Sequence, residues 1–337
     1  MKRKEYTITD IAESLNVSTA SVSRALSGAT GVSDGLRAKI SEFCDEIGYR
    51  PSPYNRNNTE RKQKIIALIL GDIRNPFYSN LAFIIQKFLR EEQYITMVFN
   101  SEYEEKNELD FIDMAERFDF SGLMLITAHS QAISHRLSNT ALPKVLVNRV
   151  LPNYNGSSVL TDNFQAGYEA ALHLINLRHR DIGFIGGTQN SSAAIQRFEG
   201  YSQAMRNYSL NISEEFLWYS DLKMETGQSI SEKFIQLEHR PTAIVCINDM
   251  TSLGFINGIK EAGFRVPEDL SVVSFDDIPI ASLHDIQLTT VSQHTEAMGK
   301  TAVKLMLKQL HSPNAQPERI IMAPQLIVRK TTGLIPN

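Results

Sequence analysis

The chain has 337 residues, of which 42% are hydrophobic and 21% charged, so we expect at least two globular domains and exclude a disordered or collagen-like protein. Its two cysteines, Cys44 and Cys246, exclude a disulfide framework, and no apolar stretch suits a signal peptide or a membrane span, so we expect a cytoplasmic protein. Residues 1–64 carry 11 basic and 8 acidic side chains (+3), whereas residues 65–337 carry 23 and 30 (−7), so the N-terminal part is better suited to contact a polyanion.

The N-terminal residues predict two short helices joined by a tight turn. Thr7 lies three residues before Asp10, which is the spacing of a capping box, so we expect a helix to begin directly after Thr7. Ser18 can cap a second helix over residues 19–27, and Gly28 suits the left-handed conformation that follows a helix end.

A third helix would complete a three-helix bundle. Ser33 can cap this helix. Its apolar residues recur at spacings of four, three and four, which places them on one face: Leu36, Ile40, Phe43 and Ile47. A bundle of this size is only marginally stable by itself, so we expect it to be attached to a larger domain.

The outward face of the second helix carries small or hydrogen-bonding residues that suit the major groove of DNA. The Arg24 guanidinium can donate two hydrogen bonds to guanine O6 and N7, and Ala20 can contact a thymine methyl group. The same residues would also suit the solvated face of any three-helix bundle. We favour the DNA interpretation, in which the contacting residues of this helix are Thr19, Ala20, Ser21, Ser23 and Arg24.

The run from Tyr6 to Gly28, YTITDIAESLNVSTASVSRALSG, resembles the DNA-binding signature of the LacI/GalR family of bacterial transcriptional regulators. Further matches extend over nearly the whole chain, at Gly48–Pro53, Asn75–Tyr78, Arg197–Tyr201, Asn248–Asp249 and Phe275–Asp277. The resemblance implies an α/β protein with a helix-turn-helix three-helix bundle, a hinge and a two-lobed, doubly wound parallel-sheet body like that of periplasmic binding proteins. The implied ranges are 1–50 for DNA binding, 51–64 for the hinge and 65–337 for effector binding and dimerisation.

The resemblance also implies a function. It implies a homodimeric repressor that binds near-palindromic, double-stranded operator DNA and responds to a small-molecule effector, a sugar or sugar derivative bound between the lobes. Thr19, Ala20 and Arg24 occupy the base-reading positions of the family. The full set of expected DNA-binding residues is Thr7, Ser18, Thr19, Ala20, Ser21, Arg24, Ser33, Tyr49, Ser52, Tyr54, Asn55, Arg56 and Asn58.

The segment 51–64 is rich in Asn, Arg, Lys and Pro and poor in apolar residues, which is typical of a linker. In the family this segment forms a short helix on DNA and inserts a leucine into the minor groove. Ser52 can cap such a helix and Arg56 matches the family, but Asn58 stands at the leucine position and Asn55 replaces a small residue. We therefore expect shallower insertion, and disorder without DNA.

From residue 65 onward, short apolar runs alternate with amphipathic stretches. Strands are expected at 65–70, 95–99, 123–127, 145–147, 182–185, 243–247 and 272–275, and helices at 77–92, 105–118, 166–177, 194–208 and 250–262. This alternation predicts parallel sheets covered by helices on both faces. Because the series resumes after Leu160, we expect two lobes, with a ligand cleft beyond the carboxyl ends of the strands.

Several polar and aromatic residues follow the expected strands and suit a polyhydroxylated ligand. Phe77 and Tyr78 would stack on a sugar ring or belong to the core. Arg197 stands where the family holds effector hydroxyls or carboxylates, although a surface salt bridge is the alternative. Leu222 replaces a frequent aromatic, so that wall would be apolar. The expected effector-binding residues are Phe77, Tyr78, Thr127, Asn148, Arg149, Arg197, Leu222, Asn248, Asp276 and Gln293.

Enzyme signatures are absent from the sequence. It has no Walker loop, no G-x-G-x-x-G and no G-x-S-x-G, and the six-residue spacings of His129/His135 and His173/His179 do not suit paired metal ligands on a helix. We therefore expect no catalytic activity, no cofactor and no metal. The rival hypothesis is a sugar-binding or sugar-modifying protein whose N-terminal bundle binds another protein.

Overall fold

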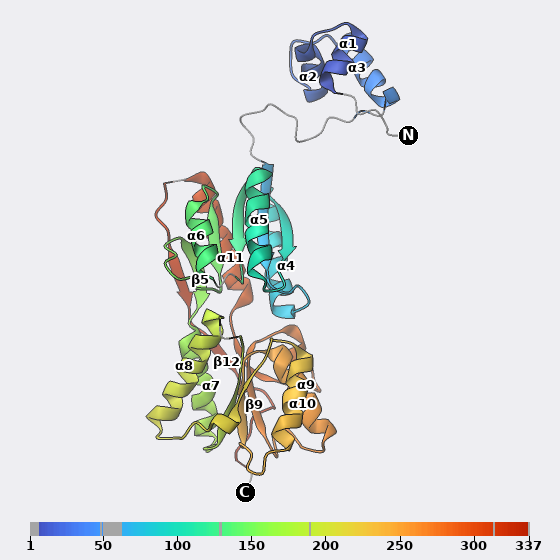
Figure 1. Ribbon diagram of the computed structural model, residues 1–337. Helices are drawn as coiled ribbons and strands as arrows, with labels where there is room; N and C mark the ends of the chain where they lie inside the picture. Colours follow the sequence, from blue (N-terminus) through green and yellow to red (C-terminus); the bar gives the residue numbers. More distant parts are fainter. Residues whose placement is uncertain are drawn as a thin grey trace. The chain divides into compact units, whose positions relative to one another are not determined.

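The computed structural model describes residues 7–47, 49, 63–127, 130–188, 190–312 and 314–335. The chain forms two compact units, Met1–Arg61 and Lys62–Asn337 (Figure 1). Within the described residues, no helix has the length and hydropathy of a membrane span, and no group of three or more His, Cys, Asp or Glu side chains could hold a metal ion. The predicted hinge residues Ser52, Tyr54, Asn55, Arg56 and Asn58 lie outside the described residues.

The N-terminal unit is a three-helix bundle with α1 (Ile8–Leu15), α2 (Thr19–Ser27) and α3 (Asp34–Ile47). The predicted caps are confirmed. Thr7 Oγ1 accepts a hydrogen bond from Asp10 N (3.3 Å) and the Asp10 carboxylate accepts one from Thr7 N (2.7 Å). Ser18 accepts from Ser21 N (3.1 Å), and Gly28 ends α2 with φ 75°. The buried core of this bundle consists of Ile11, Ala12, Val22, Ala25, Ile40 and Cys44.

The larger unit begins with a βα series that forms most of a first lobe. Its elements are β1 (Gln63–Leu70), α4 (Pro76–Glu91), β2 (Ile95–Asn100), α5 (Glu105–Arg117), β3 (Phe120–Leu125), α6 (Gln131–Asn139), β4 (Lys144–Val147) and β5 (Ser157–Thr161). Alternate residues of β1 face opposite layers: Leu68 packs towards α4, and Ile69 towards α5. Burial on both faces explains why this strand is a continuous apolar run.

A second series forms most of a second lobe. Its elements are α7 (Asn163–Asn176), β6 (Ile182–Gly186), α8 (Ser192–Asn207), η2 (Glu214–Phe216), β7 (Leu217–Tyr219), α9 (Met224–Ile235), β8 (Ala243–Cys246), α10 (Asp249–Glu261), β9 (Ser271–Asp276), η3 (Pro279–Ser282) and β10 (Thr289–Ser292). Helices α7 and α8 cover one face of this sheet, and α9 and α10 cover the other.

The C-terminal elements cross back between the lobes. Helix α11 (Thr295–His311) packs on α4 and β11 (Arg319–Met322) pairs with β5, whereas β12 (Gln325–Ile327) returns to the second sheet. The strand orders are β11-β5-β4-β3-β1-β2, all parallel, and β12-β10-β9-β8-β6-β7, in which β12 is antiparallel to β10. The two parallel lobes are thus confirmed, but the chain crosses between them three times, after β5, after β10 and after β11.

Some predicted boundaries were wrong. The strand expected at 123–127 is β3, which begins at Phe120 and ends at Leu125, and the helix expected at 166–177 begins at Asn163 because Asp162 caps it through Gln165 N (2.9 Å). Ser121 and Gly122 interrupt the apolar run of β3, and Asn163 and Gln165 stand in the first turn of α7, so neither start was visible as an apolar pattern.

Close backbone contact joins α7 to α8. A Cβ added to Gly167 would lie 2.0 Å from the carbonyl oxygen of Arg197, and one added to Gly200 would lie 2.0 Å from that of Phe164. Only residues without a side chain allow the two helices to approach this closely. This approach positions Arg197 at the edge of the second sheet.

We expect the Gly167→Ala substitution to destabilise the larger unit by about 1–3 kcal/mol, because the new methyl group must push α8 away. Gln165→Ala is the matched control, since Gln165 is exposed on the same helix, and its effect should stay within about 0.5 kcal/mol. Urea unfolding followed by circular dichroism measures both. If both variants had the same urea midpoint, the contact between α7 and α8 would accommodate the added methyl group without a loss of stability.

Candidate functional site

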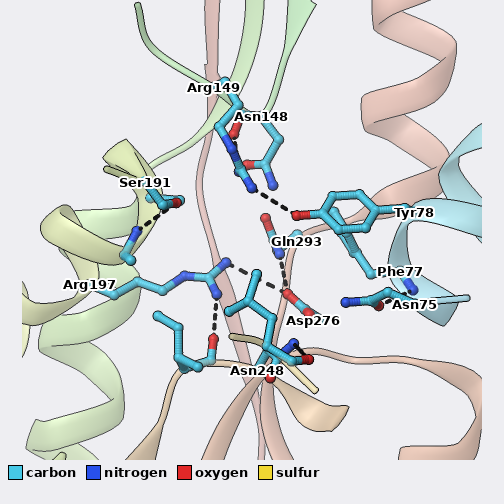
Figure 2. Close-up of a pocket in the computed structure, with 14 residues that line it drawn as sticks. Asn75, Phe77, Tyr78, Asn148, Arg149, Ser191, Arg197, Asn248, Asp276 and Gln293 are labelled. Atoms are coloured by element: carbon cyan, nitrogen blue, oxygen red, sulfur yellow. Dashed lines mark hydrogen bonds and ion pairs between the residues drawn. The ribbon is translucent and has the colours of Figure 1, made fainter. Parts of the chain in front are cut away.

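A pocket lies between the two lobes, at the carboxyl ends of strands of both sheets (Figure 2). Nine of the ten predicted effector residues line it: Phe77, Tyr78, Asn148, Arg149, Arg197, Leu222, Asn248, Asp276 and Gln293. Five further lining residues were not expected from the sequence: Asn75, Ser191, Ala193, Ala194 and Ile247. Parallel sheets bring the ends of β1, β4, β8 and β9 to common edges, which explains why strand-following residues meet here.

Thr127 is the exception among the predicted residues. It lines an adjoining cavity with Tyr103 and Thr188 rather than this pocket, and its Oγ1 donates a hydrogen bond to buried Glu108 Oε1 (2.8 Å). Because β3 ends at Leu125, two residues earlier than expected, Thr127 lies in the following turn.

Arg197 is held rigidly at the centre of the pocket. Its side chain is buried, Nε donates to Asn163 Oδ1 (2.9 Å), and Nη1 donates to the carbonyl oxygen of Ile247 (2.6 Å). Nη2 lies 3.7 Å from Asp276 Oδ1, and the guanidinium lies 4.5 Å from the ring centroid of Phe275. The alternative of a surface salt bridge is therefore wrong.

Asp276 links the pocket to the crossings between the lobes. Its Oδ1 accepts a hydrogen bond from Gln293 Nε2 (2.6 Å), and Gln293 Oε1 accepts one from Thr161 Oγ1 (3.3 Å). Thr161 ends β5 just before the first crossing, and Gln293 lies in the second crossing. A continuous polar chain therefore joins Arg197 to both crossings.

The opposite wall of the pocket is formed by Asn148, Arg149 and Tyr78. Arg149 Nη1 donates to the Asn148 carbonyl oxygen (2.7 Å) and Nη2 donates to the Tyr78 hydroxyl (2.8 Å). Among the described residues, the buried Asn148 Oδ1 accepts no hydrogen bond. Since an unsatisfied buried acceptor is costly, this oxygen is suited to a hydroxyl or N–H group of a ligand.

Three helices begin at the pocket. Asn75, Ser191 and Asn248 cap α4, α8 and α10 by accepting hydrogen bonds from the backbone N–H groups of the first turns. The positive ends of the three helix dipoles therefore point towards the same cavity. The Asn-Pro and Ser caps were visible in the sequence, so cap signals could have identified Asn75 and Ser191.

Three lining residues have left-handed backbone conformations: Asn148 (φ 57°), Leu222 (φ 72°) and Asp276 (φ 113°). This region is strained for residues with a side chain, above all for leucine. Hydrogen bonds hold Leu222 in place, since its N–H donates to Ser220 Oγ (2.9 Å) and its carbonyl oxygen accepts from Asn248 Nδ2 (3.1 Å). The pocket walls are therefore fixed by their surroundings.

A second carboxylate lies buried beneath the pocket. Asp249 accepts hydrogen bonds from Thr290 Oγ1 (2.7 Å) and from Ile278 N (2.9 Å). Burial raises its pKa above the ordinary range, and the nearby charge of Asp276 raises the pKa further. Burial also raises the pKa of Asp276, although Arg197 opposes that effect. The pair of carboxyl groups therefore still holds a proton at pH values at which exposed carboxyl groups are deprotonated.

The N-terminal unit presents the exposed face of α2. Thr19, Ala20, Ser23 and Arg24 are exposed, whereas Val22 and Ala25 on the opposite face are buried. Of the other predicted DNA-contacting residues, Thr7, Ser18 and Ser33 are exposed and Ser21 and Tyr49 are half-buried. The arrangement leaves a row of small and hydrogen-bonding side chains open to a partner.

Arg37 of α3 holds the end of α2, a role that was not expected from the sequence. Its Nη1 donates to the carbonyl oxygens of Ala25 (3.0 Å) and Arg24 (3.4 Å), and its Nη2 donates to that of Ala29 (2.8 Å). The Arg24 carbonyl oxygen also accepts hydrogen bonds from the N–H groups of Gly28 and Ala29, and a cation at a helix C-terminus complements the helix dipole. Arg37 thus fixes the backbone that carries Arg24.

Comparisons with known proteins agree with this arrangement. Residues 7–52 match the family model "Bacterial regulatory proteins, lacI family", and residues 171–332 match "Periplasmic binding protein-like domain". Over 331 residues the chain is 29% identical to the Escherichia coli K12 repressor CytR, covering 98% of this chain and 97% of CytR. It is 27% identical over 325 residues to the ribose operon repressor of Haemophilus influenzae, covering 96% and 98%.

Solved structures show the same fold. The regulator CelR in complex with cellobiose aligns with a TM-score of 0.73 and 24% identity, covering 97% of this chain and 100% of CelR. A putative LacI-type regulator from Bacillus cereus subsp. cytotoxis aligns with a TM-score of 0.74 and 26% identity, covering 80% of this chain and 98% of that one.

We expect Arg37→Met to loosen the end of α2, because charge-assisted hydrogen bonds of this kind contribute about 1.5–3 kcal/mol. Hydrogen–deuterium exchange of the full chain should show at least about tenfold faster exchange in α2 peptides. Lys39→Met removes the same charge from an exposed position of α3 and should leave this exchange unchanged. Equal exchange in both variants would contradict the role of Arg37.

The buried acid pair predicts a pH-dependent stability. The pKa of Asp249 is higher in the folded protein than in the unfolded chain. From about pH 4 towards neutral pH the folded protein therefore binds more protons at this residue than the unfolded chain does. The contribution of Asp249 to the free energy of unfolding consequently falls as the pH rises. The stability of the native chain relative to Asp249→Asn should therefore decrease with pH over this range, by up to about 1.4 kcal/mol per pH unit. Urea unfolding of both proteins at a series of pH values measures the difference, and parallel profiles would contradict it.

Proposed function

Because the chain belongs to the LacI family of bacterial regulatory proteins, we propose that it is a transcriptional repressor whose operator affinity is controlled by a sugar or sugar derivative in the pocket between its lobes. We assign DNA binding to residues 1–50, the hinge to 51–64, and effector binding and dimerisation to 65–337. The protein acts in the cytoplasm, where its operator lies, and uses no cofactor or catalytic step.

The observation that carries the DNA-binding proposal is the exposed face of α2. Thr19, Ala20 and Arg24 lie together on a helix whose opposite face is buried, so the helix can enter a major groove without unfolding. The charge of +3 on residues 1–64 favours a polyanionic partner. This arrangement is less suited to a protein-binding bundle, because the face of α2 offers few apolar side chains.

The pocket chemistry supports a polyhydroxylated effector. Hydroxyl groups donate and accept hydrogen bonds, and the lining offers both kinds of partner: acceptors on Asn148 and Asp276 and donors on Arg149 and Arg197. Phe77 and Leu222 add apolar surface for the face of a ring. Among the structural neighbours, an Enterococcus faecium regulator has bound ribose, which supports the same class of ligand here.

We propose that the protein is a homodimer that reads the two halves of a near-palindromic operator. The edge strand β2 and the adjacent helix α4 expose large apolar side chains, with 64% of Phe83, 64% of Ile95 and 41% of Met97 accessible. A second copy that covers this surface would bury it and would bring a second α2 to the DNA.

The function is tested by selecting DNA from a random pool with the full chain and then adding sugars to the complex. We expect a near-palindromic sequence and release of DNA by at least one sugar or sugar derivative. Arg24→Ala should cost about 1–3 kcal/mol per contact and relax the preference at one symmetric pair of positions. Uniform weakening on all sequences would instead assign Arg24 to phosphate contact, and failure to enrich any DNA would reject the proposal.

The dimer is tested by Phe83→Glu, which places a charge in the proposed interface. Sedimentation velocity should show a dimer for the native chain and a monomer for the variant, and the variant should lose affinity for the full operator while binding a single half-site as before. Leu334→Glu is the control, because Leu334 is equally exposed (66%) but lies near the C-terminus. A dimeric Phe83→Glu variant would place the interface elsewhere.

A further inference from the structure

Arg149 is a buried cation that lacks a carboxylate partner among the described residues. Only 6% of the residue is exposed, and its hydrogen-bond acceptors, the Asn148 carbonyl oxygen and the Tyr78 hydroxyl, are both neutral. Arg197, by contrast, faces Asp276 at 3.7 Å. Burying an uncompensated charge is unfavourable, so this guanidinium is suited to an external anion.

The lining as a whole carries a positive charge. Arg149 and Arg197 are its two cations and Asp276 is the one acid among its residues. Arg197 and Gln293 contact that acid directly, whereas among the described residues no hydrogen bond or ion pair joins it to Arg149. The positive dipole ends of α4, α8 and α10 add to this field.

The same wall also requires a hydrogen-bond donor. Within the part of the chain that the structure describes, the buried Asn148 Oδ1 has no hydrogen-bond partner, and it belongs to the residue next to Arg149. An anion such as inorganic phosphate alone presents mainly acceptors, whereas a sugar hydroxyl can donate to this oxygen. A ligand with an anionic group beside a hydroxyl group could bind both the Arg149 guanidinium and Asn148 Oδ1.

We propose that the effector is an anionic sugar derivative, a sugar phosphate or a sugar carboxylate, whose anionic group binds Arg149 and whose hydroxyl group donates to Asn148 Oδ1. This inference rests on the proposed function, because it takes the pocket to be the effector site. The planar guanidinium can bind two oxygens of a phosphate or carboxylate side by side, which a neutral sugar cannot reproduce.

The test uses the full chain and matched ligands. Isothermal titration with D-glucose, D-glucose 6-phosphate and D-glucuronate, and with D-ribose and D-ribose 5-phosphate, compares neutral and anionic forms of one sugar, and inorganic phosphate serves as a probe that is independent of the sugar. We expect saturable phosphate binding and, for a sugar that binds, at least about tenfold tighter binding of an anionic form. The phosphate and carboxylate arms show which anion is preferred.

Variants of Arg149 connect this binding to the residue. Arg149→Met should weaken phosphate binding at least about tenfold and leave the Tm of the ligand-free protein unchanged or higher, because it removes an uncompensated buried charge. Arg149→Lys should retain part of the affinity. Arg319→Met is the control, because this exposed arginine lines neighbouring cavities with Arg149 but does not line the pocket itself. The Arg319→Met variant should bind phosphate with the affinity of the native chain.

Two results would overturn the inference: phosphate that does not bind saturably, or native phosphate affinity in Arg149→Met. A neutral sugar that binds as tightly as its anionic forms and releases the selected operator would also overturn it, while leaving the proposed function intact. Failure of the proposed function would be seen separately, as the absence of any selected operator.

Discussion

The buried guanidinium of Arg197 is the interaction on which the arrangement of the pocket depends. It joins the start of α7 through Asn163, the end of β8 through Ile247 and the end of β9 through Asp276. Gln293 then extends the contact to the second crossing and to Thr161 before the first. Since a buried charge without these partners would be highly unfavourable, the strand ends and crossings of the second lobe must keep their present positions together.

Much of the fold and the site could be predicted from the sequence, because the signals concerned are local. Caps at Thr7 and Ser18 define the helices of the N-terminal unit by contacts within three residues. Strands such as β1 are buried on both faces, and their apolar runs are therefore visible without knowledge of their neighbours. Because the strands are parallel, residues just after them, such as Asn148 and Arg149, were expected to meet and do line the pocket, whereas Arg197 in α8 was expected from the family resemblance.

The remaining features depend on partners far along the chain. Strand β11 pairs with β5, more than 150 residues earlier, and has only a half-buried alternating pattern, so no local signal distinguishes it from a loop. Thr127 was misplaced because the end of β3 is set by its neighbours in the sheet. Likewise, only the three-dimensional structure shows that no carboxylate of the described residues forms an ion pair with Arg149.

The three crossings between the lobes also bear on synthesis by the ribosome. The first sheet receives its edge strand β11 only after residue 322, and the second sheet receives β12 five residues later. The ribosome therefore synthesises nearly all of the strands before either sheet can be completed. The first sheet in particular stays incomplete until the whole series from α7 to β10 has been translated. Both sheets are therefore completed within a few residues of each other, when nearly the whole chain has been made.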